Sequence, residues 1–113
     1  MLCLAIHTPA DHPVIAFAAE ELRRFLAPVA TFTDAADTNI HLQIDPSLPP
    51  YAFAVDCATL SQIILRGHDA SCVLHSVYTL LEQLGYHFEI TGARLIHTTD
   101  LEAQFAALVG WTQ

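Results

Sequence analysis

Apolar residues recur at helical spacing between Asp69 and Gly85, in the clearest pattern of the chain. Spacing of three and four residues predicts one amphipathic helix that buries a single stripe. That stripe comprises Val73, Val77, Leu80, Leu81 and Leu84. We expect Asp69 to cap the start of the helix, because its carboxylate can accept the free N–H groups of the first turn. We expect Gly85 to end it with a positive φ, which glycine adopts without a Cβ penalty.

A second helix is predicted from about Pro13 to Pro28, after a short segment that contains two prolines. Proline suits a first helical turn, where its missing N–H would have no partner, and Asp11 is the candidate N-cap. The predicted buried stripe is Val14, Ala18, Leu22, Phe25, Leu26 and Val29. The charged residues expected on the solvent side are Glu20, Glu21, Arg23 and Arg24. Among them, Glu20 and Arg24 have the spacing of an i,i+4 ion pair.

Alternation of apolar and polar residues predicts β-strands outside the helices. These strands are expected at Leu2–Ile6, Asn39–Asp45, Tyr51–Asp56, Gln62–Arg66 and Phe88–Ile90, with a last short one at Arg94–His97. Residues Ala30–Thr38 are small and polar and are expected to be a loop. Residues Pro46–Pro50 cannot supply the N–H groups of a strand and are expected to be a connector. The short turn Cys57–Ser61 predicts an antiparallel hairpin, because parallel pairing needs a longer crossover.

The predicted element order is β-α-β-β-β-α-β. It indicates an α+β fold, a two-layer sandwich with a mainly antiparallel sheet and two helices on one face. The opposite sheet face is small or polar and comprises Cys3, Ala5, His41, Gln43, Ala52, Ala54, His87 and Glu89. We expect that face to be wet, or covered by something outside this chain.

Composition narrows the classes of partner. The 113 residues suit one domain with one core. The net charge is −8, and the only cations besides histidine are Arg23, Arg24, Arg66 and Arg94. Four scattered arginines do not form the basic patch that nucleic acids or anionic membranes require, so neither is an expected partner. No run approaches the ~20 apolar residues of a membrane span. The start lacks a basic signal-peptide region, which indicates a cytoplasmic protein if Met1 is the true start.

Cysteines and histidines are the first candidates for chemistry. Cys3, Cys57 and Cys72 form no C-x-x-C pair and are expected to be small buried thiols without disulfides. The seven histidines are His7, His12, His41, His68, His75, His87 and His97. No H-x-x-x-H pair places two of them on one helix face, so no metal site is expected. His41 and His87 could approach each other on the polar sheet face, but no third ligand is evident.

Cys72 and His75 are three residues apart on the second predicted helix and are a candidate nucleophile and base. Because Cys72 falls near the buried stripe and Asp69 serves as the cap, a packed thiol is the better interpretation. The glutamates do not form the carboxylate pair of a glycosidase cleft, and no glycine-rich phosphate loop is present. The residues alone therefore predict no catalytic, cofactor-binding or metal-binding site.

Three segments together resemble one known domain. AAEELRRFL (Ala18–Leu26) resembles its first helix, IHLQI (Ile40–Ile44) the strand that follows, and RGHDASCVLHSVYTLLEQLGYHF (Arg66–Phe88) its strand–helix–strand unit. This is the accessory domain found ahead of the catalytic barrel in β-N-acetylhexosaminidases, α-glucuronidases and related bacterial glycoside hydrolases. The chain departs from the family at Cys72 and Ser76, where glycine is usual. Both residues are small, so close packing of helix on sheet is still expected.

The resemblance implies a non-catalytic domain over residues 1–98 that packs against a catalytic barrel. Residues 99–113 would be a linker, with Gly110–Gln113 at the start of the barrel. The catalytic carboxylates of the family lie in the barrel, so no active-site residue is carried onto this chain. Two alternatives remain open. One is a stand-alone interaction or homo-oligomerisation module that uses the open sheet face or the apolar segment Leu101–Val109, and the other is a small thiol or metal enzyme centred on Cys72 and His75.

Overall fold

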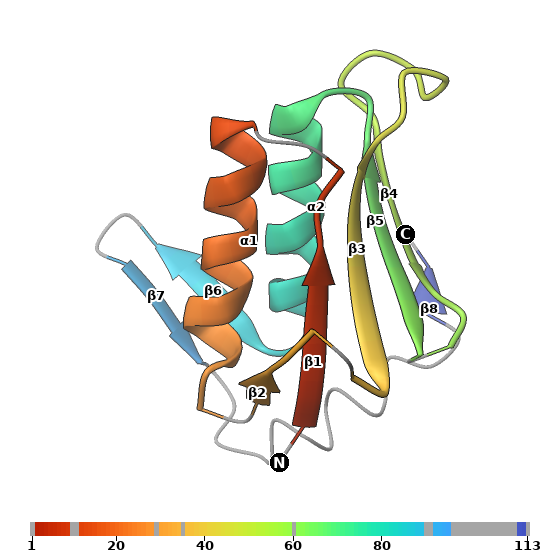
Figure 1. The fold of residues 1–113 in the computed structure, drawn as a ribbon. Coiled ribbons are helices and arrows are strands. Elements are labelled where there is room, and N and C mark those ends of the chain that lie inside the picture. The colour runs from red at the N-terminus through yellow and green to blue at the C-terminus, as the bar shows by residue number, and fades with distance from the viewer. Residues whose placement is uncertain are drawn as a thin grey trace.

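A computed structural model describes residues 2–9, 12–28, 30–34, 36–59, 61–89, 92–95 and 111–112. The elements in chain order are β1 (Leu2–His7), α1 (Pro13–Leu26), β2 (Ala30–Phe32), β3 (Thr38–Ile44), β4 (Phe53–Cys57), β5 (Gln62–Gly67), α2 (Ala70–Gln83), β6 (Tyr86–Glu89), β7 (Gly92–Leu95) and β8 (Trp111–Thr112). Six strands form one sheet in the order β2-β1-β3-β5-β4-β8, while β6 and β7 form a separate hairpin. Both helices lie on one face of the six-stranded sheet (Figure 1).

The predicted two-layer α+β architecture is confirmed, but the sheet is mixed and not mainly antiparallel. β1 pairs in parallel with β2 and β3, and β3 pairs in parallel with β5. Antiparallel pairing joins β4 to β5, which confirms the predicted hairpin, and β4 to β8. The parallel pairs arise because α1 returns the chain to the starting end of β1, and because β5 inserts between β3 and β4. Alternation along a strand fixes its buried face but not its partner.

β2 lies where the sequence predicted only a loop. Its three residues run parallel to the start of β1, with Thr31 opposite Cys3. Ala30 is buried and Phe32 packs against the core, although the neighbouring residues are small and polar. A three-residue strand is too short for its alternation to be recognised.

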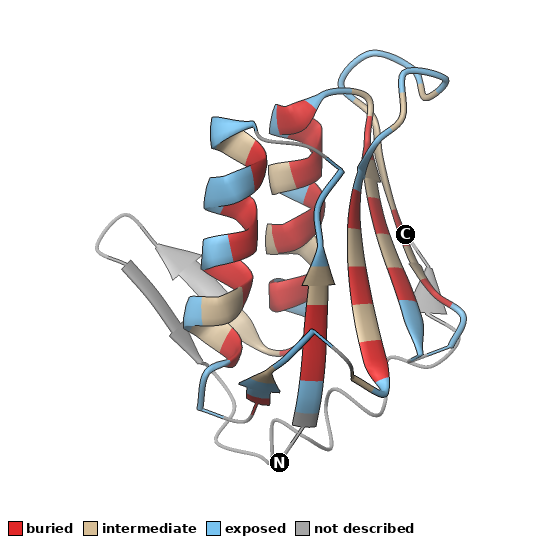
Figure 2. Ribbon diagram, viewed as in Figure 1, coloured by how far each residue is buried: buried red, intermediate tan, exposed pale blue. Residues whose placement is uncertain are grey.

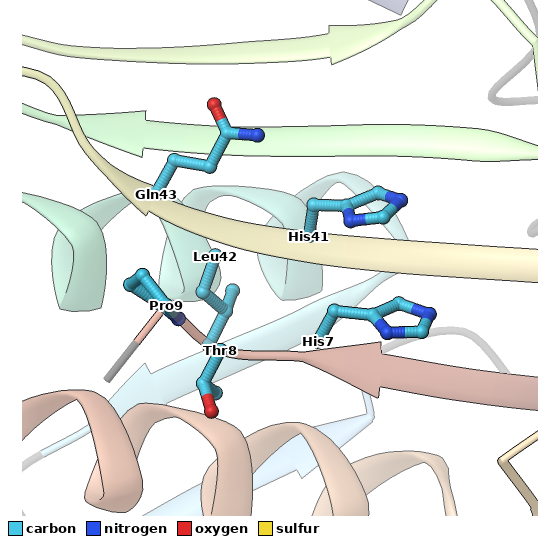
Figure 3. Close-up of a pocket in the computed structure, with 6 residues that line it drawn as sticks. All are labelled: His7, Thr8, Pro9, His41, Leu42 and Gln43. Atoms are coloured by element: carbon cyan, nitrogen blue, oxygen red, sulfur yellow. The ribbon is translucent and has the colours of Figure 1, made fainter. Parts of the chain in front are cut away.

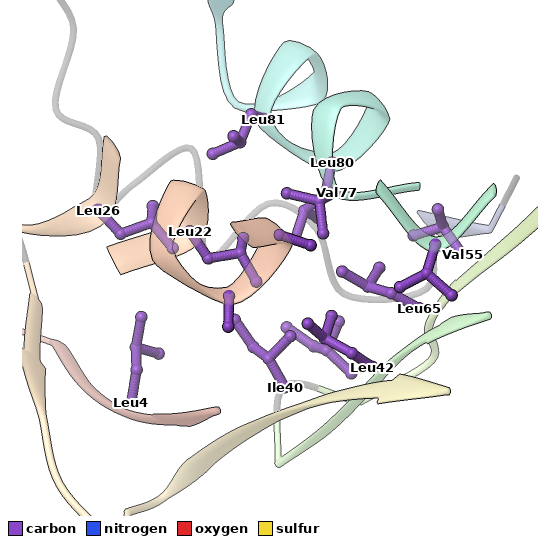
Figure 4. Close-up of a cluster of buried hydrophobic side chains, with 14 of the residues drawn as sticks. Leu4, Leu22, Leu26, Ile40, Leu42, Val55, Leu65, Val77, Leu80 and Leu81 are labelled. Atoms are coloured by element: carbon purple, nitrogen blue, oxygen red, sulfur yellow. The ribbon is translucent and has the colours of Figure 1, made fainter. Parts of the chain in front are cut away.

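The core lies between the helices and the sheet, as the buried stripes in Figure 2 and the close-up in Figure 4 show. The predicted stripe of α2 is confirmed, because all five of its members are buried. On α1, Ala18, Leu22 and Leu26 are buried as predicted, and Ile15 and Ala19 join them. The sheet contributes Leu4, Ile40, Leu42, Val55, Cys57, Ile63 and Leu65. Full burial of one such leucine or isoleucine stabilises the fold by about 1.5–3 kcal/mol.

Three details of α1 differ from the prediction. His12 and not Asp11 is the N-cap, and its Nδ1 accepts a hydrogen bond of 3.1 Å from the backbone N–H of Val14. Glu20 pairs with Arg23 at 2.6 Å and not with Arg24. Glu21 is buried and not exposed, because its position on the helix faces α2 near Tyr78. The burial of Glu21 could not be predicted, since helical spacing places a residue on a side of the helix without showing which residues meet the neighbouring helix.

The start of α2 approaches β5 closely at Gly67. A Cβ atom at this position would lie 2.3 Å from the backbone nitrogen of Val73 and 2.7 Å from Cβ of Cys72. The predicted Asp69 cap is confirmed at the same point, where its carboxylate accepts the N–H of Cys72 at 3.0 Å. Cys72 and Ser76 are both buried against the sheet side of α2. The close packing of α2 on the sheet therefore depends on Gly67 of β5 as well as on the small helical residues Cys72 and Ser76.

After α2 the chain leaves the main sheet. Gly85 has the predicted positive φ, 110°. The hydroxyl of Tyr86 then donates a 2.5 Å hydrogen bond to the carbonyl of Phe25 at the end of α1, and the two rings meet edge to face. This contact draws β6 beside the helices, where it pairs with β7 (Figure 1). The expectation that this strand belongs to one common sheet is therefore wrong. The short strand predicted at Arg94–His97 is observed as β7, at Gly92–Leu95. Segment Leu101–Val109 lies outside the described residues.

Candidate functional site

The face of the sheet opposite the helices carries polar and small side chains, as the sequence predicted. Cys3 and Gln43 are exposed, and His41, Ala52 and Ala54 are half-buried, whereas Ala5, also predicted on this face, is buried. Alternation along the strands adds further members to this open face, namely His7, Asn39, Gln62, Ile64, Arg66 and Asp56. His87 and Glu89, which were expected here, lie on β6 in the separate hairpin. The predicted approach of His41 to His87 is therefore wrong.

His41 instead meets His7, its partner in the register of β1 and β3. The two imidazole rings stack with centroids 4.6 Å apart and an interplanar angle of 16°. Nε2 of His7 lies 2.8 Å from Oδ1 of Asn39, and Nε2 of His41 lies 2.5 Å from Oε1 of Gln62. The sequence contained a signal for this pair, because the alternation of Cys3 and Ala5 continues to His7, one residue beyond the predicted end of the strand.

The Asn39 amide fixes the protonation pattern of His7. The Asn39 Nδ2 group donates to the carbonyls of Ala36 at 3.3 Å and Ser61 at 3.1 Å, which leaves Oδ1 as the atom that faces His7. An amide oxygen only accepts hydrogen bonds, so Nε2 of His7 must carry the proton in this contact. In the neutral ring, Nδ1 is then a hydrogen-bond acceptor that Asn39 does not use.

A hollow of about 170 Å³ lies where β1 and β3 end (Figure 3). It is lined by His7, Thr8, Pro9, His41, Leu42 and Gln43. The carboxyl ends of adjacent parallel strands are the usual location of ligand sites in open sheets. The lining offers imidazole, hydroxyl and amide groups but no carboxylate and no thiol. Such a surface can hold a polar ligand, but it supplies no nucleophile.

Arg66, on the same face, is paired with Asp45 at the end of β3. Their side chains approach to 3.6 Å. Hydrogen bonds from the Ser47 hydroxyl and backbone, followed by the charge of Arg66, hold the pKa of Asp45 below its ordinary value. Within the described part of the chain, Nε of Arg66 is buried without a hydrogen-bond partner. This guanidinium is a fixed cation of the open face.

The candidate thiol pair is not assembled as a catalytic site. Cys72 is buried, and its backbone N–H donates to the carboxylate of the Asp69 cap. His75 is exposed, and its ring stacks on the Phe53 ring with centroids 6.5 Å apart. Cys57 is also buried, and burial followed by the charge of Asp56 raises the pKa of its thiol to about 11. Cys3 is exposed, which corrects the expectation that all three thiols are buried.

Two further classes of site find no support in the described ranges. Within them, His, Cys, Asp and Glu side chains form no group of three or more that could hold a metal ion. Among the described helices, none has the length and apolar character required to span a bilayer.

The chain matches no known protein-family model and no curated protein sequence. Its fold is similar to part of a solved structure, that of a GH138 enzyme targeting pectin rhamnogalacturonan II. The TM-score is 0.60 at 17% sequence identity, and the match covers 73% of this chain and 13% of that one. The chain thus spans only a small fraction of the length of this neighbour. At this identity the likeness is one of fold, to a portion of a glycoside hydrolase.

Proposed function

We propose that the chain is a non-catalytic accessory domain of a carbohydrate-degrading glycoside hydrolase, packed against a catalytic barrel. The observation that carries the proposal is the match of this small fold to 13% of a GH138 glycoside hydrolase. The resemblance of Ala18–Leu26, Ile40–Ile44 and Arg66–Phe88 to accessory segments of β-N-acetylhexosaminidases and α-glucuronidases supports the same assignment. Substrate chemistry would reside in the barrel.

Four acidic side chains among the described residues have structural partners, which supports a non-catalytic role. Glycosidases place two carboxyl groups on either side of the scissile bond, about 5–10 Å apart in a cleft. Here Asp45 is held by Ser47 and Arg66, and Asp69 caps α2. Glu20 and Glu21 are each paired with an arginine one turn later. These four carboxylates thus have structural partners, and none of the four lines the hollow at the ends of β1 and β3.

The proposal is tested by assaying the purified chain on chromogenic glycosides, with and without the polypeptide encoded directly after Gln113. We expect no turnover by the chain alone, and turnover when the following barrel is present in the same polypeptide. Activity of the isolated chain that persists after rigorous purification contradicts the non-catalytic role. A reading frame that does not continue into a barrel with paired acidic residues contradicts the accessory role.

A stand-alone oligomerisation module is the second candidate. It is favoured by Phe17, whose ring is 50% exposed on the solvent side of α1. Sedimentation velocity separates the two candidates. A defined dimer that dissociates on Phe17→Ala substitution favours the oligomerisation module, whereas a monomer favours the accessory domain.

A further inference from the structure

Tyr51 is the most exposed large hydrophobic residue among those described, with 91% of its surface accessible. It lies in the connection between β3 and β4, where its φ is +66°. It is also the one non-glycine residue with a positive φ in the described ranges. Left-handed backbone is unfavourable for a residue with a bulky side chain. Tyrosine at this position therefore destabilises the turn relative to glycine. Because its ring is exposed, burial of apolar surface does not offset this cost.

The turn that presents Tyr51 is tightly held. The N–H of Ala52 donates to the carbonyl of Pro49 at 3.0 Å, which places Pro50 and Tyr51 at the two central positions. Proline at the first and positive φ at the second are the features of a type II turn, whose second central position favours glycine. Strain that the fold does not need is an indicator of function, because a folding role alone would favour glycine.

The whole connection is fastened to the end of β5. The N–H of Asp45 donates to the carbonyl of Gly67 at 2.7 Å, and the N–H of His68 donates to the carbonyl of Ala52 at 3.0 Å. The His68 ring adds a 2.7 Å hydrogen bond between its Nδ1 and the carbonyl of Leu48. Because the backbone that carries the ring is fixed by these hydrogen bonds, binding costs little backbone conformational entropy, which favours the use of Tyr51 as a contact residue.

The connection leaves β3 two residues after Gln43, at the end of the sheet where β1 also ends (Figure 1). The hollow is lined by residues from the ends of β1 and β3, so it lies at the same end of the sheet as the turn. The hollow offers neutral hydrogen-bonding groups, including the acceptor Nδ1 of His7, the Thr8 hydroxyl and the Gln43 amide. An aromatic ring at the same end of the sheet as such groups suits an extended ligand with apolar C–H faces and hydroxyl edges. The net charge of −8 disfavours a polyanion.

From these features we infer that the end of the sheet where β1 and β3 finish binds a neutral saccharide chain. The Tyr51 ring would be the stacking residue, and the hollow would be a hydrogen-bonding subsite. The choice of a saccharide rests on the proposed role in a glycoside hydrolase. The surface would hold polymer near the enzyme and would not take part in bond cleavage.

The inference is tested by titrating the ¹⁵N-labelled chain with cellohexaose, xylohexaose, mannohexaose and chitohexaose, using amide chemical shifts as the readout. We expect shifts at Tyr51 and Gln43 with at least one neutral probe, and weaker shifts with oligogalacturonate. Tyr51→Phe keeps the ring and should keep the affinity. Tyr51→Gly should lower the affinity about tenfold or more, which is the scale of a contact worth about 1.4 kcal/mol.

Thermal unfolding supplies the second readout. Tyr51→Gly should unfold at a temperature no lower than that of the wild type, because glycine relieves the left-handed strain. An absence of shifts with every neutral probe overturns the inference, as does an unchanged affinity of Tyr51→Gly or tighter binding of oligogalacturonate. These outcomes leave the accessory-domain proposal intact, since that proposal fails only if the chain cleaves glycosides or no barrel follows it.

Discussion

Replacing Gly67 with alanine tests how closely α2 approaches the sheet. The added Cβ would lie 2.3 Å from the nitrogen of Val73, 2.5 Å from the carbonyl carbon of Cys72 and 2.7 Å from its Cβ. Ordinary contacts of a Cβ begin near 3.4 Å, so the first turn of α2 must retreat by about 1 Å. Two of these three atoms are backbone, and no rotamer change moves them away.

The expected cost follows from that shift. Overpacking of a core costs about 1–3 kcal/mol when side chains can adjust. Here a helix must move as a body, which also weakens the contacts of Val73 and Val77 with the sheet. We therefore expect Gly67→Ala to lower the free energy of unfolding by about 3 kcal/mol, at or above the top of that range. Such a loss would lower the melting temperature by about 10–20 °C.

The measurement is urea unfolding of each variant, followed by circular dichroism at 222 nm. Ser71→Ala is the control, because it changes an exposed residue of the same turn and should act within about 0.5 kcal/mol. A double variant, Gly67→Ala with Cys72→Gly, removes the one side-chain contact and keeps the two backbone contacts. It should not recover stability. Recovery, or a loss below about 1 kcal/mol in Gly67→Ala alone, would show that the interface is softer than the distances imply.

Further predictions concern the cap, the hairpin and the thiols. Hydrogen bonds from Cys72 hold the pKa of Asp69 below 3.8, so its contribution to stability is present above that pH and is lost as the pH falls through the lower folded value. Asp69→Asn should keep the cap at pH 7 but reduce the loss of stability on acidification, measured by urea unfolding at pH 7 and pH 3. Tyr86→Phe removes the hydrogen bond to the end of α1 and should lower stability by about 1 kcal/mol, whereas an unchanged midpoint would mean that water replaces the hydroxyl. Ellman's reagent at pH 8 should react quickly with Cys3 and slowly with Cys57 and Cys72 until the protein is unfolded, and three equally fast thiols would contradict their burial.

Local features of this fold could be predicted because each is written in neighbouring residues. The Asp69 cap, the positive φ of Gly85 and the stripe of α2 depend on spacing within one helix. The hairpin of β4 and β5 depends on one short turn. Each of these predictions is confirmed, since tertiary contacts reinforce the local preference at these positions.

Features that depend on distant partners could not be predicted. The parallel pairing of β1 with β3 joins segments separated by a helix, and alternation is the same whichever strand lies beside them. The separate hairpin of β6 is accompanied by a hydrogen bond between Tyr86 and the carbonyl of Phe25, 61 residues earlier, which local patterns do not reveal. For the site, the stacking of His7 on His41 follows from that parallel register. The strain at Tyr51 is a backbone angle, which no count of residue types reveals.

The position of β1 between β2 and β3 has a consequence for the order of folding. β1 is synthesised before both of its partners in the sheet, and the nearer of them begins at Ala30. Its second edge stays unpaired until β3 follows at Thr38. Pairing across such separations is slow compared with closure of a hairpin. We therefore expect the β4–β5–α2 unit to form early and β1 to join late, which makes the newly synthesised β1 segment the one most in need of protection from aggregation.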